Sequence, residues 1–233
     1  MSEGRTMVMW APDWPIVAAD LPQSLPAAVL DKGQVLACSQ AARAEGVRRG
    51  MRRRDAQSRC PGLVLHDYNA DADARGFEAV LTAIESLSPG VAPLRPGLCA
   101  LRVPSRFYGG EAEAAAVIAE RLVGIGVWDV RIGIADGLFA AELAARRALA
   151  QDSLAIPRGG SAHFLRDLPI DALDDPDVVS LLRRMGLRLL CLWLLESGRT
   201  RLDILLYTRN DFCRHDVVLV VYQGRKHQLD NRR

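Results

Sequence analysis

The sequence predicts an α+β fold of the ferredoxin-like type, and three observations support this prediction. Apolar runs of strand length alternate with longer segments whose apolar residues recur at helical spacing. The order of these runs is β-α-β-β-α-β, with one long insertion after the first strand. The chain has 233 residues with 49% hydrophobic content, which is enough for one core and a second small module.

The first predicted strand covers residues 7–11 and has the apolar composition of a buried central strand. Pro12-Asp13-Trp14-Pro15 ends this strand, and a short helix is expected at residues 16–20. In the insertion, Lys32-Gly33 has the composition of a hairpin turn. Strands are expected there at residues 27–30, 35–38 and 63–66.

Two short helices are expected within the stretch of residues 34–62. Ser39 stands at the N-cap position of the first helix, and Gly46 supplies its end. The second helix is expected over residues 51–59, and Cys60-Pro61-Gly62 terminates it.

The remaining elements follow the insertion. Asp71 is expected to cap a long amphipathic helix, whose apolar residues are Phe77, Val80, Leu81, Ile84 and Leu87. Strands are expected at 98–103, 127–135 (with core residues Val130, Ile132 and Ile134) and 154–157, helices at 111–122 and 138–149, and a turn at 107–110. Residues 157–160 mark a boundary, beyond which small helices are expected.

The stretch of residues 34–62 is strongly basic, although the formal net charge of the whole chain is only +2. It contains seven arginines and only two acidic residues. The arginines are Arg43, Arg48, Arg49, Arg52, Arg53, Arg54 and Arg59. A guanidinium offers a planar fork of donors that matches phosphate oxygens, so this cluster indicates a phosphate-facing surface. A solvated charged face is the alternative interpretation.

Cysteine usage and hydropathy restrict the cellular context. The five cysteines form no CxxC pair and show no metal-type spacing with the four histidines, so free thiols in a reducing cytoplasm are expected. We expect no signal peptide, and no apolar run reaches the length that spans a membrane.

Two segments, ACSQAARAEGVRRGM and DAQSRCPGL, resemble the fingers of Y-family (UmuC/DinB-type) DNA polymerases, which lie over the incoming nucleotide. The resemblance implies a polymerase palm with an inserted fingers segment and a small helical thumb. It places the palm at residues 5–20 and 72–158, the fingers at 21–71, a partial thumb at 159–190 and an unassigned basic tail at 191–233.

Active enzymes of this family hold two divalent ions with carboxylates. On the family pattern, the two aspartates of the first strand fall on Trp10 and Pro12, and a later Asp-Glu pair falls on Pro96 and Gly97. These residues supply no side-chain oxygen ligand, and Asp13 alone would hold at most one ion weakly. We therefore expect no catalytic residue, no metal and no cofactor.

The triphosphate-binding positions of the family are also altered. Glu142 stands where the family has a lysine, which reverses the charge, and Gln40 stands in for a tyrosine. Arg43 matches a triphosphate-binding arginine. Trp10 and Trp14 are expected to be core aromatics, and Asp13 a turn or cap residue.

This pattern is similar to the catalytically degenerate ImuB branch of the family. The similarity lies in Trp-x-x-Asp-Trp-Pro from Trp10, Leu-Arg-Pro-Gly-Leu from Leu94 and Arg-Phe-Tyr-Gly-Gly-Glu from Arg106. It covers about residues 7–190 and implies a non-catalytic scaffold in DNA repair, SOS mutagenesis and translesion synthesis. The implied partners are primer-template DNA, an error-prone replicative-type polymerase, an ImuA-like accessory protein and the sliding clamp. The residues expected to contact DNA or phosphate are Arg43, Arg48, Arg49, Arg52, Arg53 and Arg54.

Three alternatives stay open at this point. From Cys191 onward the chain follows no family pattern, apart from strand-like runs at 202–207 and 217–222. A frame-shifted or truncated product explains this tail as well as a divergent DNA-binding tail does, and truncation would remove the clamp and partner contacts. The chain could also be an active error-prone polymerase that uses Asp13 and Mg²⁺, or a remnant without function.

Overall fold

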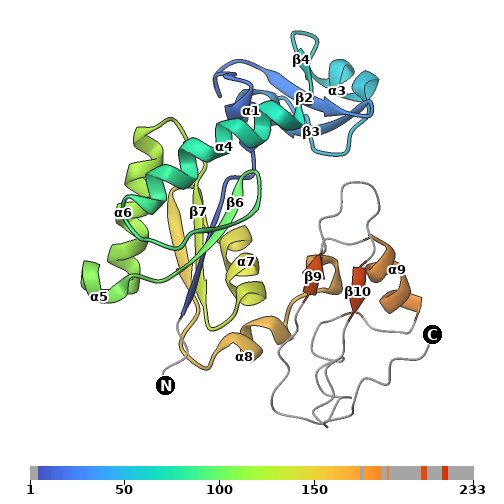
Figure 1. Ribbon diagram of the computed structural model, residues 1–233. Helices are drawn as coiled ribbons and strands as arrows, with labels where there is room; N and C mark the ends of the chain where they lie inside the picture. Colours follow the sequence, from blue (N-terminus) through green and yellow to red (C-terminus); the bar gives the residue numbers. More distant parts are fainter. Residues whose placement is uncertain (1–4, 174–175, 185–187, 189–205, 209–216, 220–233) are drawn as a thin grey trace, which may run out of the picture. The chain divides into compact units, whose positions relative to one another are not determined.

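The computed structural model describes residues 5–173, 176–184, 188, 206–208 and 217–219 (Figure 1). The chain divides into two compact units, residues 1–161 and 162–233. The first unit contains a five-stranded sheet and a three-stranded sheet. Among the described residues, no helix combines the length and the apolar composition that a membrane crossing requires.

The five-stranded sheet has the ferredoxin-like order, with strand β1 (Thr6–Trp10) at its centre. β1 pairs antiparallel with β6 (Leu98–Arg102) on one side and with β7 (Arg131–Ala135) on the other. β5 (Ala92–Arg95) pairs antiparallel with β6, and β8 (Asp152–Ala155) pairs parallel with β7. The α+β fold with a palm-like core, as the sequence predicts, is therefore confirmed.

Helices cover both faces of this sheet (Figure 1). α4 (Ala70–Glu85) and α6 (Glu111–Gly124) pack together over one face, where Met7, Met9, Ile132 and Ile134 share a core with Phe77, Val80, Ile118 and Leu122. Alternate residues of a strand point to opposite faces, so Val8 and Gly133, which are paired across β1 and β7, face the other side. α7 (Leu138–Arg147) covers that side.

The three-stranded sheet has the order β3-β2-β4 and its own core. β2 (Ala27–Asp31) pairs antiparallel with β3 (Gln34–Cys38) and parallel with β4 (Val64–Asp67). Two short helices, α2 (Gln40–Ala44) and α3 (Arg53–Arg59), pack on it, and α1 (Trp14–Ala18) follows β1. This three-stranded unit lies within the predicted fingers segment, whose limits remain predictions, as do those of the palm and thumb.

Several remaining elements are short. α5 (Ser105–Tyr108) precedes α6, and Gly109 follows it with φ +85°. The second unit contains η1 (Ile170–Leu173), α9 (Pro176–Arg184) and an antiparallel pair of strands. α8 (Ser161–Arg166) lies at the start of this unit. The paired strands are β9 (Leu206–Thr208) and β10 (Val217–Leu219), and the other residues of the two predicted tail strands lie outside the described residues.

Most predicted elements are confirmed to within a few residues, including the Ser39 cap. Its Oγ accepts a hydrogen bond from the Ala42 N–H at 3.2 Å and donates one to the Leu25 carbonyl at 2.7 Å. Gly46 follows α2 with φ +88°, a conformation that glycine adopts without a Cβ penalty.

Four predictions about element limits were wrong. The second helix begins at Arg53 rather than Met51, because residues before it pair with β3: the Val35 N–H donates to Met51 O and the Gly50 N–H to Val35 O, both at 2.8 Å. Asn69, not Asp71, caps α4 through a hydrogen bond from the Ala72 N–H at 3.0 Å. The first two residues of the expected turn at 107–110 belong to the helix α5. The strand expected from residue 127 begins only at Arg131, as β7.

The strand β5 was missed altogether. It contains Pro93, which lowers the strand signal of a four-residue run. β5 is one of the two edge strands of the sheet, and an edge tolerates a residue that cannot donate to a neighbouring strand.

Close contact between β7 and α7 leads to the first prediction. A Cβ at Gly133 would lie 2.0 Å from Ala141 O and 2.2 Å from Ala145 N, so Gly133→Ala has to push the helix away. We expect a loss of about 3 kcal/mol in the free energy of unfolding, measured by urea denaturation. Gly137→Ala is the control, because its Cβ would meet nothing within 4 Å. Equal stability of the two variants would contradict this packing.

Asp73 is a buried carboxylate on α4, close to α1. Asp73 is 5% exposed, accepts a hydrogen bond from Tyr68 Oη at 3.3 Å, and its backbone carbonyl accepts one from Trp14 Nε1 at 3.1 Å. Burial raises the pKa of Asp73 from 3.8 to about 6, although the bond from Tyr68 opposes the shift.

The raised pKa of Asp73 predicts a pH-dependent stability. The folded state holds the proton more tightly than the unfolded state, so this stabilisation is present below about pH 4 and is lost as the pH rises through about 6. Asp73→Asn is expected to be more stable than the natural protein at pH 8, by about 1–3 kcal/mol, and equally stable near pH 4. Thermal unfolding across this range tests the expectation, and a constant difference at all pH values would refute it.

Candidate functional site

Trp10, at the end of β1, contacts two guanidinium groups. It stands opposite Arg131 on β7, whose Cζ lies 5.5 Å from the centroid of the indole ring. The Cζ of Arg146, on α7, lies 5.8 Å from the same centroid. Both distances are typical of cation–π contacts. Trp10 is only half-buried, so the expectation of a core aromatic is met by Trp14, which is 4% exposed, and only partly by Trp10.

Pro96 and Gly97 form the turn between β5 and β6, and Gly97 packs closely against Trp14. Gly97 has φ +80°, and its carbonyl accepts a hydrogen bond from the Ala11 N–H at 2.8 Å. A Cβ at this position would lie 2.6 Å from the Cβ of Trp14 and 3.0 Å from the Ala11 carbonyl. This turn therefore has no room for an acidic side chain in place of Gly97.

Glu142, on α7, is held by arginines. Its Oε1 lies 2.8 Å from Arg146 Nη2 and 3.7 Å from Arg95 Nη2, at the end of β5. The carboxylate at this position thus helps to hold Arg146 near Trp10. It cannot take over the role of a phosphate-binding lysine, because its charge repels phosphate.

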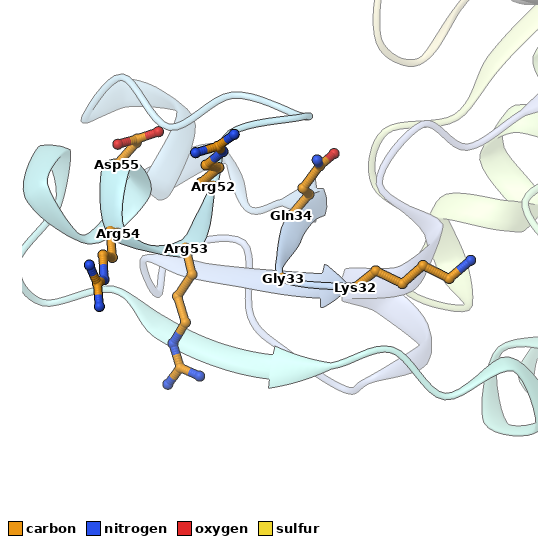
Figure 2. Close-up of a pocket in the computed structure, with 7 residues that line it drawn as sticks. All are labelled: Lys32, Gly33, Gln34, Arg52, Arg53, Arg54 and Asp55. Carbon is orange, nitrogen blue, oxygen red and sulfur yellow. The ribbon is translucent and has the colours of Figure 1, made fainter.

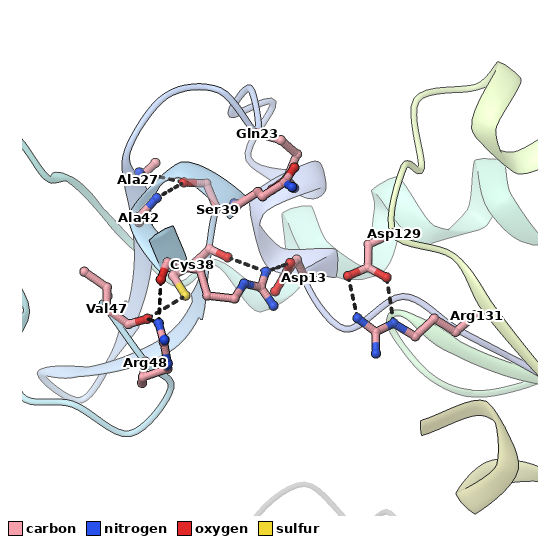
Figure 3. Close-up of polar contacts among 12 residues, drawn as sticks. Asp13, Gln23, Ala27, Cys38, Ser39, Ala42, Val47, Arg48, Asp129 and Arg131 are labelled. Atoms are coloured by element: carbon pink, nitrogen blue, oxygen red, sulfur yellow. Dashed lines mark hydrogen bonds and ion pairs between the residues drawn. The ribbon is translucent and has the colours of Figure 1, made fainter. Parts of the chain in front are cut away.

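Asp13, labelled in Figure 3, forms an ion pair with Arg43, and this pair joins the two sheets of the first unit. Asp13 follows β1 and Pro12 at the start of α1 and is 7% exposed, whereas Arg43 belongs to α2. Arg43 Nη2 donates to Asp13 Oδ2 and also to the Cys38 carbonyl at 3.2 Å. Burial raises the pKa of Asp13, and Arg43 opposes that shift. Asp13 stands at the N-cap position of α1, as expected, but its side chain makes no cap hydrogen bond.

A second carboxylate near Trp10 is paired in the same way. Asp129 accepts two hydrogen bonds from Arg131, at 2.7 and 3.0 Å (Figure 3). Arg131 Nη1 also donates to the Ala148 carbonyl at 3.3 Å. In the part of the chain that the structure describes, no group of three or more His, Cys, Asp or Glu side chains could hold a metal ion. The donor set around Trp10 is therefore rich in guanidinium, which does not fit a pair of divalent cations.

The structure divides the six arginines expected to contact phosphate. Arg43 is committed to Asp13, and Arg48 Nη1 donates to the carbonyls of Arg43 and Val47 at 2.6 and 2.8 Å. Arg49 is exposed in the loop between α2 and α3. Arg52, Arg53 and Arg54 are exposed at the start of α3 and do come together, in one pocket.

This basic pocket lies beside the β2–β3 hairpin turn and has a volume of about 450 Å³ (Figure 2). Its lining residues are Lys32, Gly33, Gln34, Arg52, Arg53, Arg54 and Asp55. The bridge between Gln34 and Arg52 and the hydrogen bond from the Arg53 N–H to Gly33 O, at 3.1 Å, hold α3 against the turn.

Sequence reasoning missed four of these residues as members of a site. Arg95, Arg131 and Arg146 come from three elements that are distant in the sequence, so no local pattern brings them to Trp10. Lys32 did have a signal, because it is one of only two lysines in the chain and stands at a predicted hairpin turn.

Comparison with known proteins gives one family. Residues 17–146, more than half of the chain, match the impB/mucB/samB family. DNA polymerase IV of Dehalococcoides mccartyi (strain CBDB1) is 28% identical over 160 residues, which cover 68% of this chain and 39% of that protein. DNA polymerase IV 2 of Mesorhizobium japonicum is 28% identical over 143 residues, which cover 60% of this chain and 34% of that protein.

Solved structures share the fold. DinB from Sulfolobus solfataricus matches with a TM-score of 0.64 at 18% identity, over 84% of this chain and 60% of that one. A post-insertion binary complex of Dbh DNA polymerase matches with a TM-score of 0.68 at 17% identity and the same coverage. The chain thus spans about two fifths or less of the two curated relatives and about three fifths of these two solved chains.

The Asp13–Arg43 pair generates a prediction about stability. Arg43→Met leaves a nearly buried carboxylate without its partner, and we expect a loss of about 2 kcal/mol at pH 7, because one partner is partly exposed. Without Arg43 the pKa of Asp13 rises further, so the loss is largest at high pH and disappears below about pH 4. The double variant Asp13→Asn/Arg43→Met should recover most of the loss in urea denaturation.

Arg49→Met is the matched control, since its exposed guanidinium should contribute within about 0.5 kcal/mol. If Arg43→Met destabilises the protein no more than Arg49→Met does, the pair contributes nothing to the junction.

Proposed function

The chain belongs to the impB/mucB/samB family and is a homologue of Y-family DNA polymerases, and we propose that it binds primer-template DNA without catalysing nucleotide transfer. The proposed role is that of a DNA- and partner-binding scaffold in damage-induced mutagenesis and translesion synthesis.

One observation supports the absence of catalysis above all others: the guanidiniums of Arg131 and Arg146 cover Trp10 at the end of β1. Nucleotide transfer requires two divalent ions about 3.5–4 Å apart, held by carboxylates at this place. Guanidinium groups cannot ligate a cation, and they repel one electrostatically. Gly97 excludes a carboxylate from the second position, because Trp14 fills the space a side chain would need.

The finer assignment rests on the resemblance to the ImuB branch, whose motifs include Trp10, Pro12, Pro96 and Gly97. It supports a cytoplasmic protein that works with an error-prone replicative-type polymerase, an ImuA-like accessory protein and the sliding clamp. The proposed contacts with DNA come from the exposed arginines of the three-stranded unit, which are Arg48, Arg49, Arg52, Arg53 and Arg54. No metal or other cofactor takes part.

The second candidate function is an error-prone DNA polymerase, which the similarity to two DNA polymerase IV proteins favours. In that case Asp13 would have to leave Arg43 and hold Mg²⁺ together with a carboxylate from elsewhere.

Primer extension separates the two functions. We expect no templated incorporation by the 233-residue chain with either Mg²⁺ or Mn²⁺, because the ligand positions are filled. Fluorescence anisotropy in the same buffers should show binding to primer-template DNA that weakens steeply with salt. A full-length DNA polymerase IV serves as the positive control.

Templated incorporation that Asp13→Ala abolishes would overturn the non-catalytic proposal. Absence of DNA binding at low salt would overturn the scaffold proposal, whatever the outcome of the extension assay.

A further inference from the structure

The basic pocket beside the β2–β3 turn is separate from the positions around Trp10. It is built from one hairpin turn and the start of α3, all within the three-stranded unit. None of the elements that line it supplies a residue to the cluster of Trp10, Arg131 and Arg146. The pocket therefore needs an explanation of its own.

Four cationic side chains and one carboxylate face this pocket. Lys32, Arg52, Arg53 and Arg54 are all exposed, and within the described residues no carboxylate pairs with them. Asp55 is the only acidic residue of the lining. Like charges held within one small region repel each other, so an arrangement of this kind is relieved by an anionic ligand.

The directions of the side chains indicate which kind of anion fits. Figure 2 shows that the ends of Lys32, Arg53 and Arg54 extend in different directions rather than toward one point. A cup for one small anion requires convergent donors, whereas a chain of phosphates requires donors spread along its path. The spread therefore favours an extended polyanion over a free phosphate.

The turn leaves the backbone accessible beside these cations. Gly33 has φ +77°, and a Cβ there would meet nothing within 4 Å, so a ligand can approach the main chain closely. Gln34 is exposed at the same place and carries an amide that can donate to a phosphate oxygen.

We propose that this pocket is a binding subsite for the sugar–phosphate backbone of a single nucleic-acid strand, with Lys32, Arg52, Arg53 and Arg54 contacting successive phosphates. The inference rests on the proposed DNA-binding function and assigns that binding to one place. Asp55 lies among these cations and weakens the attraction, because its carboxylate repels the strand.

The test compares two triple variants of the full chain that lose the same charge. The pocket variant is Arg52→Gln/Arg53→Gln/Arg54→Gln. The matched control is Arg75→Gln/Arg102→Gln/Arg121→Gln, which removes three exposed arginines from α4, β6 and α6. Binding of a fluorescent oligothymidine is measured by anisotropy over a series of salt concentrations.

We expect the pocket variant to bind the strand about tenfold more weakly, and its slope of log K against log salt to fall by about 2. The control should keep the affinity to within about twofold, and Asp55→Asn should tighten binding several-fold. Misfolding can weaken DNA binding but does not strengthen it, so tighter binding by Asp55→Asn cannot come from misfolding. Circular dichroism of each variant checks the fold.

Four results would overturn the inference. Equal weakening by both triple variants would show that binding follows overall charge. Arginine-dependent binding of inorganic pyrophosphate without binding of oligothymidine would show a cup for small anions. A natural chain that binds no DNA at all would remove the proposed function as well, whereas normal binding by the pocket variant removes only the subsite.

Discussion

The ion pair between Asp13 and Arg43 is the interaction on which the arrangement of the first unit depends. Asp13 follows the central strand of the five-stranded sheet, and Arg43 belongs to a helix of the three-stranded unit. A nearly buried carboxylate that stays charged needs such a partner, so the pair favours the arrangement in which the two sheets meet here. In this pair, Arg43 also neutralises Asp13, the carboxylate that follows β1. The same contact thus stabilises the junction and withholds a potential metal ligand.

Around this pair, the positions to which the family resemblance assigns the metal ligands of active Y-family enzymes carry other groups, which pack against their neighbours. Arg131 and Arg146 cover Trp10, and Trp14 leaves no space beside Gly97. The cation–π contacts of Trp10 and the burial of Trp14 contribute to the stability of this region. Under the proposed function, the absence of catalysis and the packing of this region have the same physical cause.

The sequence predicted the fold well where its signals are local. Helix α4 was recognised from the spacing of Phe77, Val80 and Ile84, and the cap at Ser39 from residue type. β5 was missed because Pro93 lowers the strand signal of this segment. The proline is tolerated because β5 lies at an edge of the sheet. The start of α3 was missed because Gly50 and Met51 pair with Val35, a contact between separate segments.

The site was harder to predict than the fold, for the same reason. Arginine clustering identified the basic stretch, but only tertiary structure separates Arg43, which is bonded to Asp13, from Arg53, which faces the pocket. The cation–π contacts of Trp10 come from Arg131 and Arg146, and nothing near Trp10 in the sequence indicates these two residues.

Binding of divalent manganese tests the central claim most directly, because it examines the ligand positions without depending on DNA or substrate. The claim predicts that titration of the natural chain, followed by the electron paramagnetic resonance of free Mn²⁺, shows no saturable site. Saturable binding of Mn²⁺ that Asp13→Ala abolishes would contradict it, since Asp13 would then be a metal ligand and not the partner of Arg43.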